Sequence, residues 1–135
     1  MELPAAVIED LKRRARDAAR LAYAPYSRFP VGAAVLCDDD KVYTGANVEN
    51  ASYSLAMCAE RNAIFQAIAN GARRIRAVAV YTPTTTVTTP CGACRQVIIE
   101  FGGDVLVVCC ADNTAAEQRY SIGELLPQAF GPANL

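Results

Sequence analysis

The 135-residue chain contains no histidine, and this absence restricts the chemistry that it can perform. Histidine is the commonest metal ligand and the one side chain that titrates near neutral pH without perturbation. Any bound zinc must therefore be held by thiolates and carboxylates. Any proton transfer must use Glu, Asp, Lys, Tyr or water.

Long apolar segments are also lacking. The apolar runs are short and interrupted by Gly, Pro and charged residues, and none approaches the roughly 20 residues that span a bilayer. Residues 1–4 show neither the basic start nor the apolar core of a secretory signal. We therefore expect a soluble, cytoplasmic protein with no membrane partner.

The chain has little net charge, with 13 basic and 14 acidic residues giving −1. A nucleic-acid binder usually carries a basic excess, because counterion release supplies much of its affinity. The charge balance therefore favours a small-molecule partner and no nucleic acid. Hydrophobic residues make up 53%, enough for a substantial core, and the length predicts a single domain over residues 1–135.

Hydrophobic periodicity predicts helices and strands in alternation. Helices are predicted at residues 8–22, 58–70 and 92–101. Strands are predicted at residues 31–37, 42–46, 76–82 and 105–109. The order predicts a mixed sheet with helices on both faces. The threonine- and proline-rich residues 82–90 form a connection, for which the sequence indicates no function.

Cysteine occurs at six positions. In a chain without a secretion signal, these residues are better explained as metal ligands, reactive thiols or buried hydrophobes than as disulfides. Cys91 and Cys94 form a C-x-x-C motif at a predicted helix start, and this spacing lets both sulfurs reach one ion. A redox motif is the alternative, but it requires a thioredoxin-like βαβ pattern that we do not find around it.

Cys58 and Glu60 supply what a catalytic zinc site still needs. A third thiolate leaves the fourth tetrahedral position for water, which zinc acidifies into a nucleophile. Glu60 can face that water without binding the metal and can carry its proton to a substrate. The alternative is a closed four-thiolate site, with Cys37, Cys109 or Cys110 as the fourth ligand. These three lie in apolar strand segments, where a buried thiol is the simpler interpretation.

Three thiolates give a zinc site a net charge of −1, which weakens the metal as a Lewis acid. Both cysteine clusters lie at predicted helix N-termini, where the positive end of the dipole stabilises thiolates. Arg61 and Arg95 each directly follow a cluster, and either could donate hydrogen bonds to sulfur.

This combination of ligands, glutamate and P-C-x-x-C matches the zinc-deaminase signature, and the sequence resembles the small, homotetrameric cytidine deaminases. The resemblance covers nearly the whole chain and is carried by residues 24–34, 45–53, 58–61, 90–98 and 124–130. It implies a three-layer α/β/α sandwich with a mixed, mostly five-stranded sheet. It further implies one Zn²⁺ per chain, held by Cys58, Cys91 and Cys94, and a homotetramer with active sites shared between subunits.

The resemblance also implies roles for individual residues. Glu60 is the proton shuttle, and Arg61 hydrogen-bonds the zinc thiolates. Asn47 and Glu49 resemble the residues that hold the ribose hydroxyls, as an amide and a carboxylate can do. The Ala59 backbone reads the cytosine amide edge, Phe29 lines the pocket and Phe130 reaches into a neighbouring subunit's site. The substrate-binding set is therefore Phe29, Asn47, Glu49, Tyr53, Ala59 and Phe130, with packing alone as the alternative for Tyr53.

We accordingly expect hydrolytic deamination of free cytidine and 2′-deoxycytidine, in which zinc-bound hydroxide attacks C4 and ammonia leaves. One alternative is a deaminase for another pyrimidine nucleoside, such as an aminonucleoside antibiotic. A polynucleotide-editing deaminase is a second, although it would need a basic channel. A catalytically silent zinc or nucleoside-binding module is a third, although it would not require Glu60.

Overall fold

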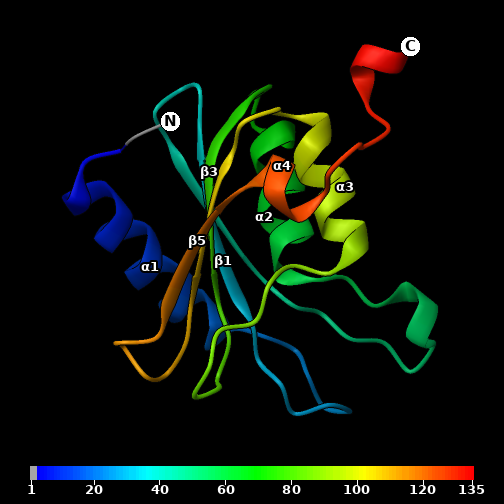
Figure 1. The fold of residues 1–135 in the computed structure, drawn as a ribbon. Coiled ribbons are helices and arrows are strands. Elements are labelled where there is room, and N and C mark those ends of the chain that lie inside the picture. Colours follow the sequence, from blue (N-terminus) through cyan, green and yellow to red (C-terminus); the bar gives the residue numbers. More distant parts are fainter. Residues whose placement is uncertain (1–2) are drawn as a thin grey trace.

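The computed structural model describes residues 3–135. Residues 1 and 2, which belong to the segment without the features of a secretory signal, lie outside the described part. Five strands form one mixed sheet in the order β2-β1-β3-β4-β5 (Figure 1). The strands are β1 (Gly32–Cys37), β2 (Val42–Ala46), β3 (Ile75–Tyr81), β4 (Leu106–Cys110) and β5 (Glu117–Ser121). The β3–β4 pair is parallel and the other neighbouring pairs are antiparallel, which confirms the predicted mixed sheet.

Helices cover both faces of this sheet, as predicted. The helices are α1 (Ala5–Ala19), α2 (Ala59–Ala69), α3 (Gly92–Glu100) and α4 (Ile122–Leu125). Figure 1 shows α1 on one face and α2, α3 and α4 together on the other. Two 3-10 turns, η1 (Tyr53–Leu55) and η2 (Pro132–Asn134), interrupt the loops. Across residues 3–135, no helix has both the length and the apolar character needed to cross a membrane.

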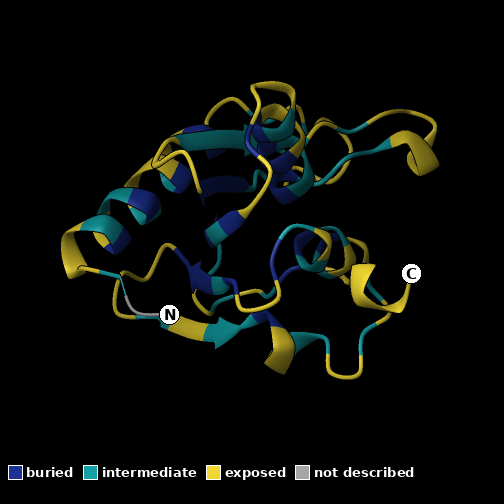
Figure 2. Cartoon of the chain, turned by 90° about the horizontal axis from the view of Figure 1, so that it is seen from above, coloured by how far each residue is buried: buried dark blue, intermediate teal, exposed yellow. Residues whose placement is uncertain are grey.

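The pleat of the central strands divides the core into two clusters. In β1, Ala33 and Val35 pack in the cluster that includes α2 and α3, while Ala34 and Leu36 pack in the cluster that includes α1. Every residue of β1 is buried, because the strand has neighbours on both edges and helices on both faces. Figure 2 shows the buried residues gathered in the sheet and on the inner helix surfaces, whereas the C-terminal segment is exposed.

The sequence patterns did not locate β5, and they extended the first helix too far. β5 is half-buried or exposed along its length and pairs with β4 at the edge of the sheet. Such an edge strand lacks the alternation of apolar and polar residues that identifies a half-buried strand. The first helix ends at Ala19 rather than at residue 22.

The N-termini of α2 and α3 carry the predicted zinc ligands, and α2 packs directly against Gly45 of β2. Cys58 is the N-cap of α2 and Cys91 is the N-cap of α3, and both have extended backbones. A Cβ at Gly45 would lie 2.5 Å from the Ala63 nitrogen and 2.7 Å from the Ala59 carbonyl oxygen. The first turns of α2 therefore rest directly on the backbone of β2.

Candidate active site

Three thiols from the two helix N-termini converge on one point. The Sγ atoms of Cys58, Cys91 and Cys94 all lie within 4.8 Å of one another. The Cys58 and Cys91 sulfurs are 3.8 Å apart. Cys94 lies in the first turn of α3 and is fully buried, whereas Cys91 is exposed. The helix starts thus bring together the three cysteines that the sequence indicated as zinc ligands.

This donor set fits zinc. In a tetrahedral site with Zn–S bonds of about 2.3 Å, neighbouring sulfurs are about 3.8 Å apart. The Cys58–Cys91 separation of 3.8 Å matches that edge. Among residues 3–135, no fourth Cys, Asp or Glu ligand atom joins the group of three. The cluster could therefore hold a zinc ion by three ligands, which leaves a coordination position open.

Hydrogen bonding among the thiols favours ionisation at one of them. The bond from the Cys94 thiol, together with bonds from Arg61 and Cys91, lowers the pKa of Cys58 to about 5. The same bond to Cys58, together with burial, raises the pKa of Cys94. These hydrogen bonds therefore favour the thiolate form at Cys58 over that at Cys94, and metal binding would release thiol protons.

Glu60 is a buried carboxyl beside this cluster. It is the second residue of α2 and is 5% exposed. Burial is the main reason that its pKa rises to about 7. A carboxyl with a pKa near the working pH can both accept and release a proton, as a general acid–base group must.

Arg61 and Arg95 were both predicted as possible hydrogen-bond donors to a cysteine sulfur, and in the structure Arg61 makes this hydrogen bond. Arg61 Nη2 donates to Cys58 Sγ at 3.4 Å. The donors of Arg95 instead fix the chain around α3. Its Nε and Nη1 donate to the carbonyls of Pro90 and Leu125, both at 2.7 Å, and its Nη2 donates to Thr89 Oγ1 at 2.8 Å. Arg95 therefore holds the segment before Cys91 against the end of α4.

A cavity of about 390 Å³ opens beside Cys58, Cys91 and Glu60. Seven of the residues that were predicted to bind metal or substrate or to catalyse line it. Its complete lining is Ser27, Phe29, Val31, Asn47, Glu49, Cys58, Ala59, Glu60, Val80, Thr82, Thr88, Thr89 and Cys91. A nucleoside-sized ligand in this cavity would contact both the thiol cluster and the predicted sugar-binding pair.

Asn47 and Glu49 are held by the loop that precedes β1. Asn47 Nδ2 donates to the Phe29 carbonyl, and Asn47 Oδ1 accepts from the Val31 amide, each at 2.9 Å. Glu49 accepts hydrogen bonds from the backbone and side chain of Ser27. These bonds lower the pKa of Glu49, with the Ser27 hydroxyl as the main cause. Glu49 therefore enters the cavity as a carboxylate.

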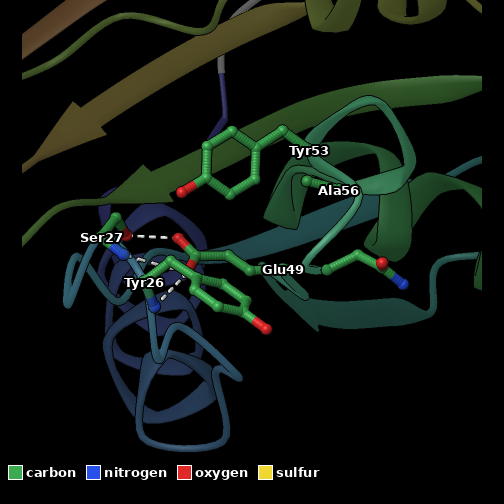
Figure 3. A pocket seen from close by; sticks show the side chains of 6 residues that line it. Tyr26, Ser27, Glu49, Tyr53 and Ala56 are labelled. Carbon is green, nitrogen blue, oxygen red and sulfur yellow. Dashed lines mark hydrogen bonds between the residues drawn. The ribbon is translucent and has the colours of Figure 1, made fainter.

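Tyr53 and Phe130 do not line this cavity. Tyr53 is 75% exposed and borders a neighbouring hollow of about 290 Å³, shown in Figure 3 together with Tyr26, Ser27 and Glu49. Ser27 and Glu49 line both spaces. Phe130 is 61% exposed, and its carbonyl accepts a hydrogen bond from Gln96 Nε2.

The residues that sequence reasoning missed are hydroxyl side chains of the cavity wall. Ser27 lies in the first segment that carries the family resemblance, but nothing in its own surroundings indicated chemistry. Thr82, Thr88 and Thr89 belong to the threonine-rich connection for which we had no function. Thr82 is 2% exposed and pairs with Thr84 through their hydroxyls.

The remaining cysteines are core residues, as the simpler interpretation predicted. Cys37 and Cys109 are fully buried in the core cluster beneath α2 and α3. Cys110 is buried in the cluster beneath α1. Burial raises the pKa of Cys37 and of Cys109 to about 12, so both remain thiols.

Comparison with known proteins places these features in a family. Residues 6–111 match the family model described as the cytidine and deoxycytidylate deaminase zinc-binding region. A cytidine deaminase from Sporosarcina psychrophila is 42% identical over 128 residues, covering 95% of this chain and 94% of that protein. One from Mycobacterium tuberculosis H37Rv is 46% identical over 121 residues, covering 90% and 87%.

Solved structures of cytidine deaminases have a similar backbone. The crystal structure of a cytidine deaminase from Burkholderia pseudomallei superposes with a TM-score of 0.86 at 48% identity, covering 90% of this chain and 98% of that one. The Mycobacterium tuberculosis cytidine deaminase structure superposes with a TM-score of 0.78 at 45% identity, covering 92% and 97%. The similarity in sequence and in backbone therefore extends over the region that contains the three thiols, Glu60 and the cavity.

Proposed function

Because this chain belongs to the cytidine and deoxycytidylate deaminase family, we propose that it hydrolyses cytidine and 2′-deoxycytidine to uridine and 2′-deoxyuridine, releasing ammonia. The observation that carries this proposal is the convergence of three thiols and one buried carboxyl on a cavity that also contains Asn47 and Glu49. A bond forms between C4 of the base and a water oxygen, and the bond from C4 to the exocyclic nitrogen breaks.

Cys58, Cys91 and Cys94 would hold the zinc ion. When bound, zinc supplies the Lewis acidity that makes water a usable nucleophile at neutral pH. Arg61 offsets part of the thiolate charge through its hydrogen bond to Cys58 Sγ. These residues therefore keep the cluster compact and limit its negative charge.

Glu60 would move the protons. Its buried carboxylate would take one proton from the attacking water and deliver it to the ring nitrogen, and would then take the second proton from the new hydroxyl on C4 and deliver it to the departing amine. The pKa of about 7 supports this role, because one group must both gain and lose a proton within a cycle. Burial on α2 also keeps bulk water from competing for that proton.

The other cavity residues would orient the nucleoside. Asn47 and Glu49 hold the sugar hydroxyls, and the Ala59 backbone with Glu60 reads the amide edge of the base. Phe29 closes one side of the cavity, which its place in the lining supports. Tyr53 would contact the nucleoside from the adjoining hollow.

We further propose a homotetramer with shared active sites, built from a single domain over residues 1–135. Large apolar side chains remain exposed near the cavity and at the C-terminal end, which supports contacts with other subunits. They include Tyr23, Val48, Tyr53, Leu55 and Phe130. Phe130 would reach the site of a neighbouring subunit, and light scattering of the purified protein tests the assembly. Pyrimidine salvage in the cytoplasm is the setting that this reaction fits.

The reaction is tested by following absorbance during cytidine deamination while measuring the zinc content of the same sample. We expect turnover together with about one zinc per chain. A preparation with one zinc per chain that converts no cytosine nucleoside would contradict the proposed substrate.

A further inference from the structure

The Glu49 carboxylate accepts hydrogen bonds from one short loop, at Tyr26 and Ser27. Tyr26 N donates to Glu49 Oε1 at 2.9 Å, and Ser27 N donates to the same oxygen at 3.1 Å. The Ser27 hydroxyl donates to the other oxygen, Oε2. Figure 3 shows the Glu49 carboxylate directed at Ser27, with these bonds drawn as dashed lines. One residue, Ser27, thus contacts both oxygens of the carboxylate.

The number of acceptor sites limits what Glu49 can bind besides this loop. A carboxylate offers about four lone-pair sites, two on each oxygen. Among residues 3–135, the two backbone donors fill Oε1, whereas Oε2 receives only the Ser27 hydroxyl. Glu49 therefore has one acceptor site left, on the oxygen whose direction Ser27 sets.

The Ser27 hydroxyl also connects Glu49 to the wall of the cavity. Its oxygen accepts a hydrogen bond from the Phe29 amide at 3.1 Å, and its hydrogen is donated to Glu49 Oε2. Between these residues, Arg28 has a φ of 57°, in the left-handed region that residues other than glycine rarely adopt. The Ser27 bonds on both sides of Arg28 hold this turn closed.

We propose that Ser27 is a positioning residue for substrate binding, whose hydroxyl turns the free acceptor site of Glu49 Oε2 toward a sugar hydroxyl of the nucleoside. This inference rests on the proposed function, because it takes Glu49 as the residue that binds the sugar. Without the hydroxyl, Glu49 keeps its Oε1 bonds but can pivot about them. The Phe29 amide also loses its acceptor.

The test compares Ser27→Ala with the wild-type enzyme on cytidine, 2′-deoxycytidine and 2′,3′-dideoxycytidine. We expect kcat/KM for cytidine to fall about tenfold, mainly through KM, as for loss of one hydrogen bond to a charged group. The loss should shrink to less than about twofold on the nucleoside that lacks the hydroxyl bound by Glu49. Ser27→Thr keeps the hydroxyl and should restore most of the activity on cytidine. Ser54→Ala, at an exposed serine of η1, is the matched control.

A second measurement separates positioning from a general effect on the fold. In a double-mutant cycle, Ser27→Ala should add almost nothing to Glu49→Gln, because both changes remove the same contact. Equal losses on all three nucleosides, or additive losses in the cycle, would overturn the role of Ser27 while leaving the proposed function intact. A zinc-loaded wild-type protein that deaminates none of the three would overturn the proposed function and this inference with it.

Discussion

Gly45→Ala is expected to lower activity by displacing α2, the helix whose N-terminus carries Cys58 and Glu60. The added Cβ would lie 2.5 Å from the Ala63 nitrogen and 2.7 Å from the Ala59 carbonyl oxygen, whereas ordinary contacts begin near 3.4 Å. Both atoms belong to the backbone of α2, so no side chain can rotate away. The first turns of α2, with Cys58 and Glu60 at their start, must therefore move by nearly an ångström.

The size of this movement sets the expected losses. Overpacking of a tight contact costs about 1–3 kcal/mol of stability, which for a domain of this length lowers Tm by about 4–12 °C. A catalytic group misplaced by about 1 Å can lose about a hundredfold in rate. We therefore expect kcat for cytidine to fall about a hundredfold at temperatures where the Gly45→Ala protein remains folded.

Gly103→Ala is the matched control, because a Cβ at Gly103 would meet nothing within 4 Å. The assay measures cytidine turnover, zinc content and the thermal unfolding curve of both variants and the wild type. If Gly45→Ala retains the kcat of Gly103→Ala, the close seating of α2 on β2 does not control the position of the catalytic residues. That result would refute the reasoning.

Arg61→Ala is expected to lower kcat about tenfold and to speed zinc loss to a chelator, because Cys58 Sγ loses its donor. Arg95→Ala is expected mainly to lower the free energy of unfolding, by about 1–3 kcal/mol, because the Pro90 and Leu125 carbonyls lose their donor. Similar, negligible losses of activity in both variants would contradict the charge-offset role of Arg61. Removal of zinc with a chelator should lower Tm, and added zinc should restore it, since the ion binds the folded thiol cluster. An unchanged Tm in a sample shown to have lost its zinc would count against that coupling.

The helices α1, α2 and α3 and four of the five strands could be predicted from local patterns, whereas β5, at one edge of the sheet, could not. β1, β3 and β4 are almost entirely buried, and the apolar residues of β1, of β4 and of β3 beyond Arg76 indicate this in the sequence. β5 has no such signal, because hydrogen bonds to β4 hold a mostly polar segment in the sheet. Its position depends on a partner distant in sequence, which periodicity cannot reveal.

The cysteines of the thiol cluster could be predicted from the sequence because their spacing along the chain determines how close their sulfurs lie. Cys91 and Cys94 lie within one helical turn, and Cys58 with Glu60 starts another helix, so each pair was predictable from local structure. That the two helix starts meet is a long-range fact, which the family resemblance supplied and the structure shows.

The contacts of neighbouring side chains could not be read in the same way. Arg61 and Arg95 each directly follow a motif that contains a predicted ligand, yet only Arg61 contacts sulfur among the described residues. The Arg95 guanidinium donates to the carbonyls of Pro90 and Leu125 instead. Leu125 is 30 residues away in sequence, so the residues around Arg95 do not indicate this contact. Ser27 was missed for the same reason, because its partner Glu49 is 22 residues away.

Glu60→Gln tests the central claim most directly. The substitution keeps the shape of a side chain that is 5% exposed and removes its capacity to exchange protons. Because burial already disfavours the charged carboxylate, we expect the fold to be retained, with about one zinc per chain. Cytidine turnover should fall by about 10²–10⁴-fold, the contribution of a general acid–base group. A folded, zinc-loaded Glu60→Gln protein that deaminates cytidine at the wild-type rate would contradict the account.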